Sequence, residues 1–284
     1  MLNSLYSGLS GIEQFQGRLD VIGNNIANSN TLAFKSATAN FADAFSQTLQ
    51  ASSPGSSTTS GTSAMQVGSG VTTSTIRNNY GQGSLTTGIQ SDLAVQGGGY
   101  FTVKDPVSGN TFATRAGDFK LDSNGYLITS KGMRVQGFTN GTSGTIGDIQ
   151  IDAAGAPTST TVPAPTYTGY SIDHQGQIHV SLSDSTSFIR GQVLLQSFRD
   201  PQALLKQGDN LYSGLAAAGP TSTTPQAAGT NGLGDIIAGQ LETSNVDLAK
   251  EFADLITTQR GFQASARMIT TSDEILQEVV SLKR

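Results

Sequence analysis

The chain has 284 residues, no cysteine and a formal net charge of -5, with 13% charged and 36% hydrophobic residues. This length allows one large domain or two smaller ones. The lack of cysteine excludes disulfides, thiolate metal sites and cysteine nucleophiles. The lack of a basic block leaves nucleic-acid binding with little electrostatic support. A surface of neutral polar groups is typical of β-rich extracellular or assembly proteins.

The N-terminal segment carries an apolar stripe with steps of three and four residues, which predicts a helix from about Asn3 to Asn28. Glycines interrupt the stripe, and each costs up to ~1 kcal/mol relative to alanine in a helix. Such a helix needs a partner surface. The residues expected to form its assembly seam are Leu5, Leu9, Ile12, Phe15, Leu19, Ile22 and Ile26.

A matching stripe at the other end of the chain predicts a second helix from about Val246 to Leu282, with Ser244 and Asn245 as N-cap candidates. Polar residues at two seam positions would set the register of pairing at a cost in stability. Two long stripes at the extremes of the chain favour helix pairing in an assembly over packing on the parent domain. The expected seam residues here are Leu248, Phe252, Leu255, Phe262, Ile269, Leu276 and Val280.

The middle of the chain changes character twice. No charged residue occurs from Ala44 to Ile76, where serine, threonine and glycine predict a linker or an irregular extended segment. From Arg77 to about Asp235 the pattern is β, with hairpin turns expected at Asn124-Gly125 and Gln175-Gly176.

The predicted fold class is therefore α+β, with long N- and C-terminal helices that pair as a coiled coil and a mostly antiparallel β domain. The expected domain organisation is an N-terminal core helix at 1–30, an extended polar arm at 31–76, a β-rich body at 77–240 with a short insertion at about 139–168, and a C-terminal core helix at 241–284.

No group of residues predicts catalysis, a cofactor or a metal. His174 and His179 lie in one predicted hairpin without a carboxylate cluster around them. The glycine-rich "QGGGYF" of residues 96–101 does not open a helix, as a phosphate loop would. The acidic "DFKLDSNG" of residues 118–125 lacks the final glutamate of a calcium loop.

The sequence predicts neither membrane insertion nor a cleaved signal peptide. No run approaches the ~20 apolar residues that a transmembrane helix requires. The opening stretch lacks a basic n-region, a continuous apolar h-region and a small-residue cleavage site.

Several stretches resemble the flagellar rod and hook family of axial proteins, and together they cover both chain ends and the first half of the β body. These stretches are "LYSGLSG", "LDVIGNNIANSNTLAFK", "DLAVQGGGYFTV", "TRAGDFKLDSNGYLIT", "GDNLY" and the C-terminal run from "QLETSNVDLAKEF" to "SLKR". Within the family the two ends are most similar to a short hook protein. Only a short insertion is available for the outer domain that many hook proteins carry, which keeps the distal rod as the alternative.

The resemblance implies a structural subunit of the bacterial flagellum, exported without a cleaved signal peptide and located outside the cell. It implies a flexible, curved hook tube that transmits motor torque, with a straight distal rod as the alternative. A secreted β-rich adhesin with helical ends is a remoter alternative that does not depend on the resemblance. Terminal helices of many copies would line the tube. The implied partners are further copies, the distal rod, the hook cap, the hook–filament junction proteins and the type III export apparatus.

Two expectations follow for particular residues. The asparagines of the family motif should satisfy backbone groups locally and bond across subunit boundaries; they are Asn24, Asn25, Asn28 and Asn30. The uncharged stretch from Ala44 to Ile76 should provide contacts that slide as a hook bends, so that charged replacements at Ser56 to Ser60 would stiffen the tube.

Overall fold

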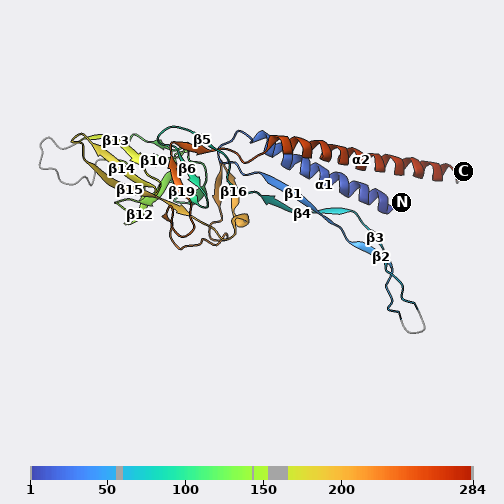
Figure 1. The fold of residues 1–284 in the computed structure, drawn as a ribbon. Helices are drawn as coiled ribbons and strands as arrows, with labels where there is room; N and C mark the ends of the chain where they lie inside the picture. The colour runs from blue at the N-terminus through green and yellow to red at the C-terminus, as the bar shows by residue number, and fades with distance from the viewer. Residues whose placement is uncertain (1, 56–59, 143, 153–165, 283–284) are drawn as a thin grey trace. The chain divides into compact units, whose positions relative to one another are not determined.

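The computed structural model describes residues 2–55, 60–142, 144–152 and 166–282. The chain divides into two compact units. Residues 1–29, 36–79 and 246–284 form the first, called here the helical unit, and residues 30–35 and 80–245 form the second, called here the β body. Figure 1 draws the helical unit at the two ends of the colour scale and the β body mostly in green to orange.

Among the described residues, the helical unit contains two α-helices and four strands. Its elements are α1 (Leu2–Ala27), β1 (Ala37–Asp43), β2 (Ser46–Gln50), β3 (Met65–Gly68), β4 (Val71–Asn78) and α2 (Leu248–Ser281). Both helices therefore end within two residues of the bounds that the apolar stripes predict. Neither is long and apolar enough to cross a membrane, within the part of the chain that the structure describes.

The helices begin and end with side-chain and backbone caps. Asp247 is the N-cap of α2, because its carboxylate accepts hydrogen bonds from the backbone N–H groups of Ala249 and Lys250 at 3.0 and 3.3 Å. The predicted caps Ser244 and Asn245 are therefore wrong. At the end of α1, Asn28 donates from its backbone and side chain to the carbonyl of Asn24 at 3.1 and 2.9 Å.

Residues 37–78, which include the uncharged segment, form two antiparallel strand pairs rather than an irregular linker. Strand β1 pairs with β4 along its length, with a bulge between Asn40 and Phe41. Strand β2 pairs with β3, and every residue of these two strands is exposed. Composition missed the strands because serine and threonine are compatible with both a linker and a solvated hairpin.

The β body holds the remaining strands, and every pair of them is antiparallel. Its elements are β5 (Leu85–Thr87), β6 (Leu93–Gln96), β7 (Tyr100–Lys104), β8 (Thr111–Thr114), β9 (Lys120–Leu121), β10 (Leu127–Ile128), β11 (Arg134–Phe138), β12 (Ile146–Asp148), β13 (Tyr167–Ile172), β14 (Gln177–Leu182), β15 (Ser187–Gln196), the short helix η1 (Pro201–Ala203), β16 (Leu205–Gly208), β17 (Leu211–Ser213), β18 (Gln226–Ala227), β19 (Asp235–Ala238) and β20 (Gln240–Glu242).

One large sheet runs through the β body in the order β13-β14-β15-β11-β7-β8-β17-β16. Separate pairs join β6 to β19 and β5 to β20, so the last strands before α2 pair with the first strands of the body. The predicted α+β class with mostly antiparallel strands is confirmed, while the pairing of the helices as a coiled coil stays a prediction.

The core of the β body is made of apolar residues that alternate along the central strands. Phe101 of β7 is fully buried and contacts Phe119 edge to face, with ring centroids 5.2 Å apart. Val193 and Leu195 of β15 are also fully buried. Burying each such side chain contributes about 1.5–3 kcal/mol, so the body can stabilise itself without the terminal helices.

Both predicted hairpin turns are present. Gly125 has φ 79° and donates to the carbonyl of Asp122 at 2.8 Å, between β9 and β10. Gly176 has φ 80° and donates to the carbonyl of Asp173 at 3.0 Å, between β13 and β14. Of the expected insertion at about 139–168, residues 143 and 153–165 lie outside the described part of the chain. The domain boundaries stay a prediction.

Candidate functional site

The two helices of the helical unit pack antiparallel through small residues (Figure 1). A Cβ atom placed on Gly8 would lie 3.1 Å from Cγ1 of Ile269, and one on Gly11 would lie 2.9 Å from Oγ of Ser265. A Cβ atom on Gly261 would lie 2.7 Å from the ring of Phe15. These glycines therefore allow the helix axes to approach closely, which explains why a helix this poor in intrinsic propensity contains them.

Asn25 connects three elements of the helical unit. Its side chain is 1% exposed. Its Nδ2 donates to the carbonyl of Ala37 at 2.8 Å and to Oε1 of Glu251 at 3.1 Å, while its Oδ1 accepts from the backbone N–H of Ala37 at 3.0 Å. The end of α1 is thus joined to the start of β1 and to the first turn of α2 within one chain.

The other asparagines of the predicted motif behave differently from Asn25. Asn28 Nδ2 donates to Oδ1 of Asn24 at 2.9 Å, which is the local bonding expected of them. Asn24 and Asn30 are exposed. Their predicted role across subunit boundaries stays a prediction.

The expected seam residues divide by exposure. Ile22 is buried, and nine of them are half-buried, namely Leu5, Ile12, Phe15, Leu19, Ile26, Leu255, Phe262, Ile269 and Leu276. Four are exposed, namely Leu9, Leu248, Phe252 and Val280. Alongside these four, α2 also exposes Ile256, Met268, Ile275 and Val279. The helix pair therefore leaves a large apolar surface uncovered in the single chain.

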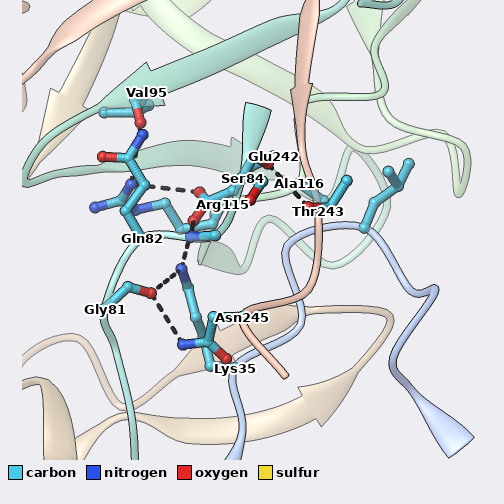
Figure 2. Close-up of polar contacts among 12 residues, drawn as sticks. Lys35, Gly81, Gln82, Ser84, Val95, Arg115, Ala116, Glu242, Thr243 and Asn245 are labelled. Carbon is cyan, nitrogen blue, oxygen red and sulfur yellow. Dashed lines mark hydrogen bonds and ion pairs between the residues drawn. The ribbon is translucent and has the colours of Figure 1, made fainter. Parts of the chain in front are cut away.

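A buried charge cluster lies in the β body, at the end of β20 (Figure 2). Lys35 Nζ donates to Oε1 of Glu242 at 2.6 Å, and neither side chain is exposed. Arg115 Nη1 lies 3.4 Å from Oε2 of the same glutamate, and the Arg115 side chain is 5% exposed. One carboxylate thus serves two buried cations from distant parts of the sequence. We call Lys35, Arg115 and Glu242 the charge cluster.

Backbone groups complete the charge cluster. Arg115 Nη2 donates to the carbonyl of Gly97 at 2.6 Å, and Lys35 Nζ donates to the carbonyl of Gly81 at 2.8 Å. Burial lowers the pKa of Lys35 and outweighs the opposing attraction of Glu242. Nε of Arg115 is buried without a hydrogen-bond partner among the described residues. The burial of these charges therefore costs desolvation free energy, which the hydrogen bonds and ion pairs of the cluster offset.

Aromatic side chains border the charge cluster. The guanidinium of Arg115 lies over the ring of Tyr100, 5.2 Å from its centroid. Tyr100 in turn packs against Tyr212 and Phe198, at centroid distances of 5.8 and 5.6 Å. Burial raises the pKa of Tyr100 to about 12, so this phenol stays neutral at physiological pH.

The charge cluster could not be predicted from local sequence patterns. Its members are separated by 207 and 127 positions along the chain, so no local spacing reveals them. One signal was available: Lys35 directly follows the apolar residues Leu32, Ala33 and Phe34 in a chain with few charges, which is compatible with a buried cation.

The candidate chemical sites give no catalytic arrangement. His179 Nε2 lies 3.5 Å from Oδ2 of Asp173, and both side chains are more than a third exposed. The glycines at 97 and 99 have φ 116° and 127° and form the turn between β6 and β7. No cluster of three metal-ligating side chains occurs among the described residues.

Three family models match the chain in order. The "Flagella basal body rod protein" model matches residues 5–35, the "Flagellar hook protein FlgE/F/G D1 domain" model matches residues 94–180, and the "Flagellar basal body rod FlgEFG protein C-terminal" model matches residues 237–282. Each of the three matched segments contributes one member of the charge cluster.

Comparison with single proteins gives full-length matches. The chain is 40% identical to the flagellar basal-body rod protein FlgG of Bacillus subtilis (strain 168), over 285 residues and 100% of both chains. The chain belongs to the flagellar rod and hook family of axial proteins. It is also 35% identical to the FlgG of Buchnera aphidicola subsp. Schizaphis graminum (strain Sg), over 99% of this chain and 100% of that one.

The flagellar hook protein FlgE of Borreliella burgdorferi is a more distant relative. It is 29% identical in an alignment of 450 positions, which covers 100% of both chains. Because the alignment is much longer than this chain, the hook protein carries extra residues that this chain lacks. Membership of the family makes this chain a structural component of the flagellum and not an enzyme.

Proposed function

We propose that this axial protein is a subunit of the distal rod, which polymerises into a straight, rigid tube that transmits motor torque. The observation that carries the proposal is the full-length match at 40% identity to a rod protein, with almost no length difference between the chains. The hook protein alignment needs 450 positions and has lower identity. The hook interpretation favoured by the chain ends is therefore less well supported than the rod alternative.

The exposed apolar surface of α2 supports polymerisation. Phe252 and Ile256 each remain 51% exposed although they occupy a long helix that is already paired with α1. Near the other end of α2, Ile275 and Val279 are 51% and 48% exposed. Apolar patches on this scale mark contacts with other proteins. In a helical polymer, further copies of the chain would cover these exposed residues of α2.

The paired strands of the helical unit offer a further surface for neighbouring copies. A ladder of backbone hydrogen bonds joins β1 to β4 and β2 to β3, whereas an irregular linker would have no such ladder. An isolated two-stranded hairpin is marginally stable in water, so β2 and β3 need a surface to pack on. We propose that neighbouring copies supply that surface, with Phe45 and Leu49 as exposed contacts.

The partners implied by the family are part of this proposal. The rod subunit would join further copies of itself, the hook that follows it and the type III export apparatus that delivers it. A straight rod does not require the sliding contacts that we expected of a hook. Of the residues proposed for charged replacement, 56–59 lie outside the described part of the chain.

Immunogold labelling of isolated flagella tests the proposal. An epitope inserted at Gly109, an exposed glycine with φ 72° in the β7–β8 turn, leaves both helices unchanged. Gold on the straight segment of the basal body supports the distal rod. Gold along the curved segment outside the cell would instead assign the chain to the hook.

A further inference from the structure

The chain passes between the two units at four places, namely 29/30, 35/36, 79/80 and 245/246. Three of these crossings lie within two residues of Lys35, Gly81 and Asn245. Lys35 Nζ and Asn245 Nδ2 both donate to the carbonyl of Gly81, at 2.8 and 3.0 Å (Figure 2). The backbone N–H of Asn245 also donates to the carbonyl of Phe34 at 3.3 Å. The three segments through which the chain leaves the β body are therefore bonded to one another inside that body.

Glu242 lies at the centre of these bonds. Its Oε1 accepts from Lys35 and from the backbone N–H of Gly83 at 2.8 Å, and its Oε2 faces Arg115. Its backbone carbonyl accepts from the N–H of Ala33 at 2.8 Å. Glu242 thus bonds from β20 to both segment 30–35 and segment 80–84, and Arg115 anchors it to the core of the body.

We propose that Glu242 is a clamp that fastens the three exit segments of the β body, so that they open and close together rather than one at a time. The clamp consists of the charge cluster together with Gly81, Gly83 and Asn245. It is a conformational device of the single chain and does not need a polymer to form.

The charge of Glu242 explains why the clamp can bond several segments at once. Buried ion pairs are often no more stabilising than apolar side chains of the same size, so stability alone does not explain this arrangement. A carboxylate with four acceptor positions can bond several separate segments at once, which an apolar side chain cannot do. The glutamate is also the only anion in the charge cluster, so its loss leaves two buried cations uncompensated, whereas the loss of Lys35 leaves a balanced pair.

The clamp explains why a rod subunit would keep buried charges that are costly in free energy, and this step rests on the proposed function. Force applied along the chain where it passes from one unit to the other acts on the exit segments of the β body. Segments fastened to one another share this force, whereas separate segments would peel away in turn.

Hydrogen exchange on the purified full-length chain before assembly tests the clamp. In Glu242→Gln, the amides of Ala33, Gly83 and Asn245 should exchange about 100-fold faster or more, since an uncompensated buried charge is strongly destabilising. The amides of Leu127 and Ile149, which bond inside the core at 3.0 Å, should be unchanged. The matched control is Asp148→Asn, which removes a carboxylate from the partly exposed Arg134 pair and should change the same amides less than about tenfold.

A second variant tests the clamp if Glu242→Gln does not fold. Lys35→Met leaves Glu242 paired with Arg115, so Ala33 and Asn245 should exchange about tenfold faster while Gly83 stays protected. Equal acceleration at Leu127 and Ile149 in the variant that is measured would show a global loss of stability and overturn the clamp. Unchanged exchange at Ala33 and Asn245 would overturn it as well. Because the measurement uses the unassembled chain, its failure leaves the distal rod proposal standing.

Discussion

At the residue scale, two buried polar side chains join segments that lie far apart in the sequence. The surface is largely neutral, yet the buried polar residues Asn25 and Glu242 each bond to segments far apart in the sequence. Buried groups of this kind are costly unless every bond is made, so each fixes one arrangement of the chain. Their effects can be measured separately because Asn25 lies in the helical unit and Glu242 lies in the β body.

Asn25→Ala should destabilise the helical unit by about 2–3 kcal/mol, because it leaves the N–H and carbonyl of Ala37 without their partners. Urea unfolding followed by circular dichroism of the helices measures this change. Asn24→Ala is the matched control, since Asn24 is exposed and its replacement should cost less than about 0.5 kcal/mol. Equal losses in the two variants would contradict the bridging role of Asn25.

Glu251→Gln should change how the stability of the helical unit depends on pH. Burial raises the pKa of Glu251 above its usual 4.5. The folded state then binds the proton more tightly, so the wild type loses stability relative to the variant as pH rises from about 4.5 through the folded pKa. Below that window the two chains should unfold alike. Thermal unfolding between about pH 4 and pH 7 measures the difference, and parallel pH profiles would show that Glu251 does not titrate in this way.

At the element scale, sequence periodicity predicted the helices well and the strand pairs of the helical unit poorly. The apolar stripes predicted α1 and α2, because a helix repeats every 3.6 residues and both segments are long. The turns at Gly125 and Gly176 could also be predicted, because a turn is signalled by a short local pair of residues. Residues 37–78 carry no such signal, because serine, threonine and glycine are frequent there and every residue of β2 and β3 is exposed. The charge cluster joins residues 35, 115 and 242, and only the tertiary fold brings them together.

The glycines of the helix pair should respond oppositely to the same change. Gly17→Ala should stabilise the helical unit by about 0.5–1 kcal/mol, since no heavy atom lies within 4 Å of the new methyl group. Gly261→Ala should be at least about 1 kcal/mol less stable than Gly17→Ala, because its methyl group meets Phe15, whose ring already packs on Phe41. Thermal unfolding compares the two variants. Similar gains from both would show that the helices do not approach closely at Gly261.

Phe252→Asp should abolish polymerisation without unfolding the helix pair, because Phe252 is half exposed on α2 and a charge there cannot be buried in an interface. Sedimentation of the assembled protein measures polymer, and circular dichroism checks helix content. Phe252→Leu keeps the apolar contact and should still assemble. Leu255→Asp should also block assembly, and normal assembly of both aspartate variants would refute the predicted seam.

At the scale of the whole molecule, the chain combines a β body that buries its own core with a helical unit whose apolar surface is only partly covered. The β body encloses a hydrophobic core of its own, whereas Phe252, Ile256 and Ile275 are exposed in the single chain. This division explains how one chain can fold alone and still assemble. Removing residues 1–29 and 246–284 should therefore give a folded β body that no longer polymerises.

Electron microscopy of tubes assembled from the purified full-length chain tests the central claim most directly. A distal rod subunit should form straight tubes, since its contacts hold one fixed geometry around the tube axis. Curved or supercoiled tubes would contradict the rod assignment and restore the hook. A chain that stays monomeric at every concentration would contradict assembly through the terminal helices altogether.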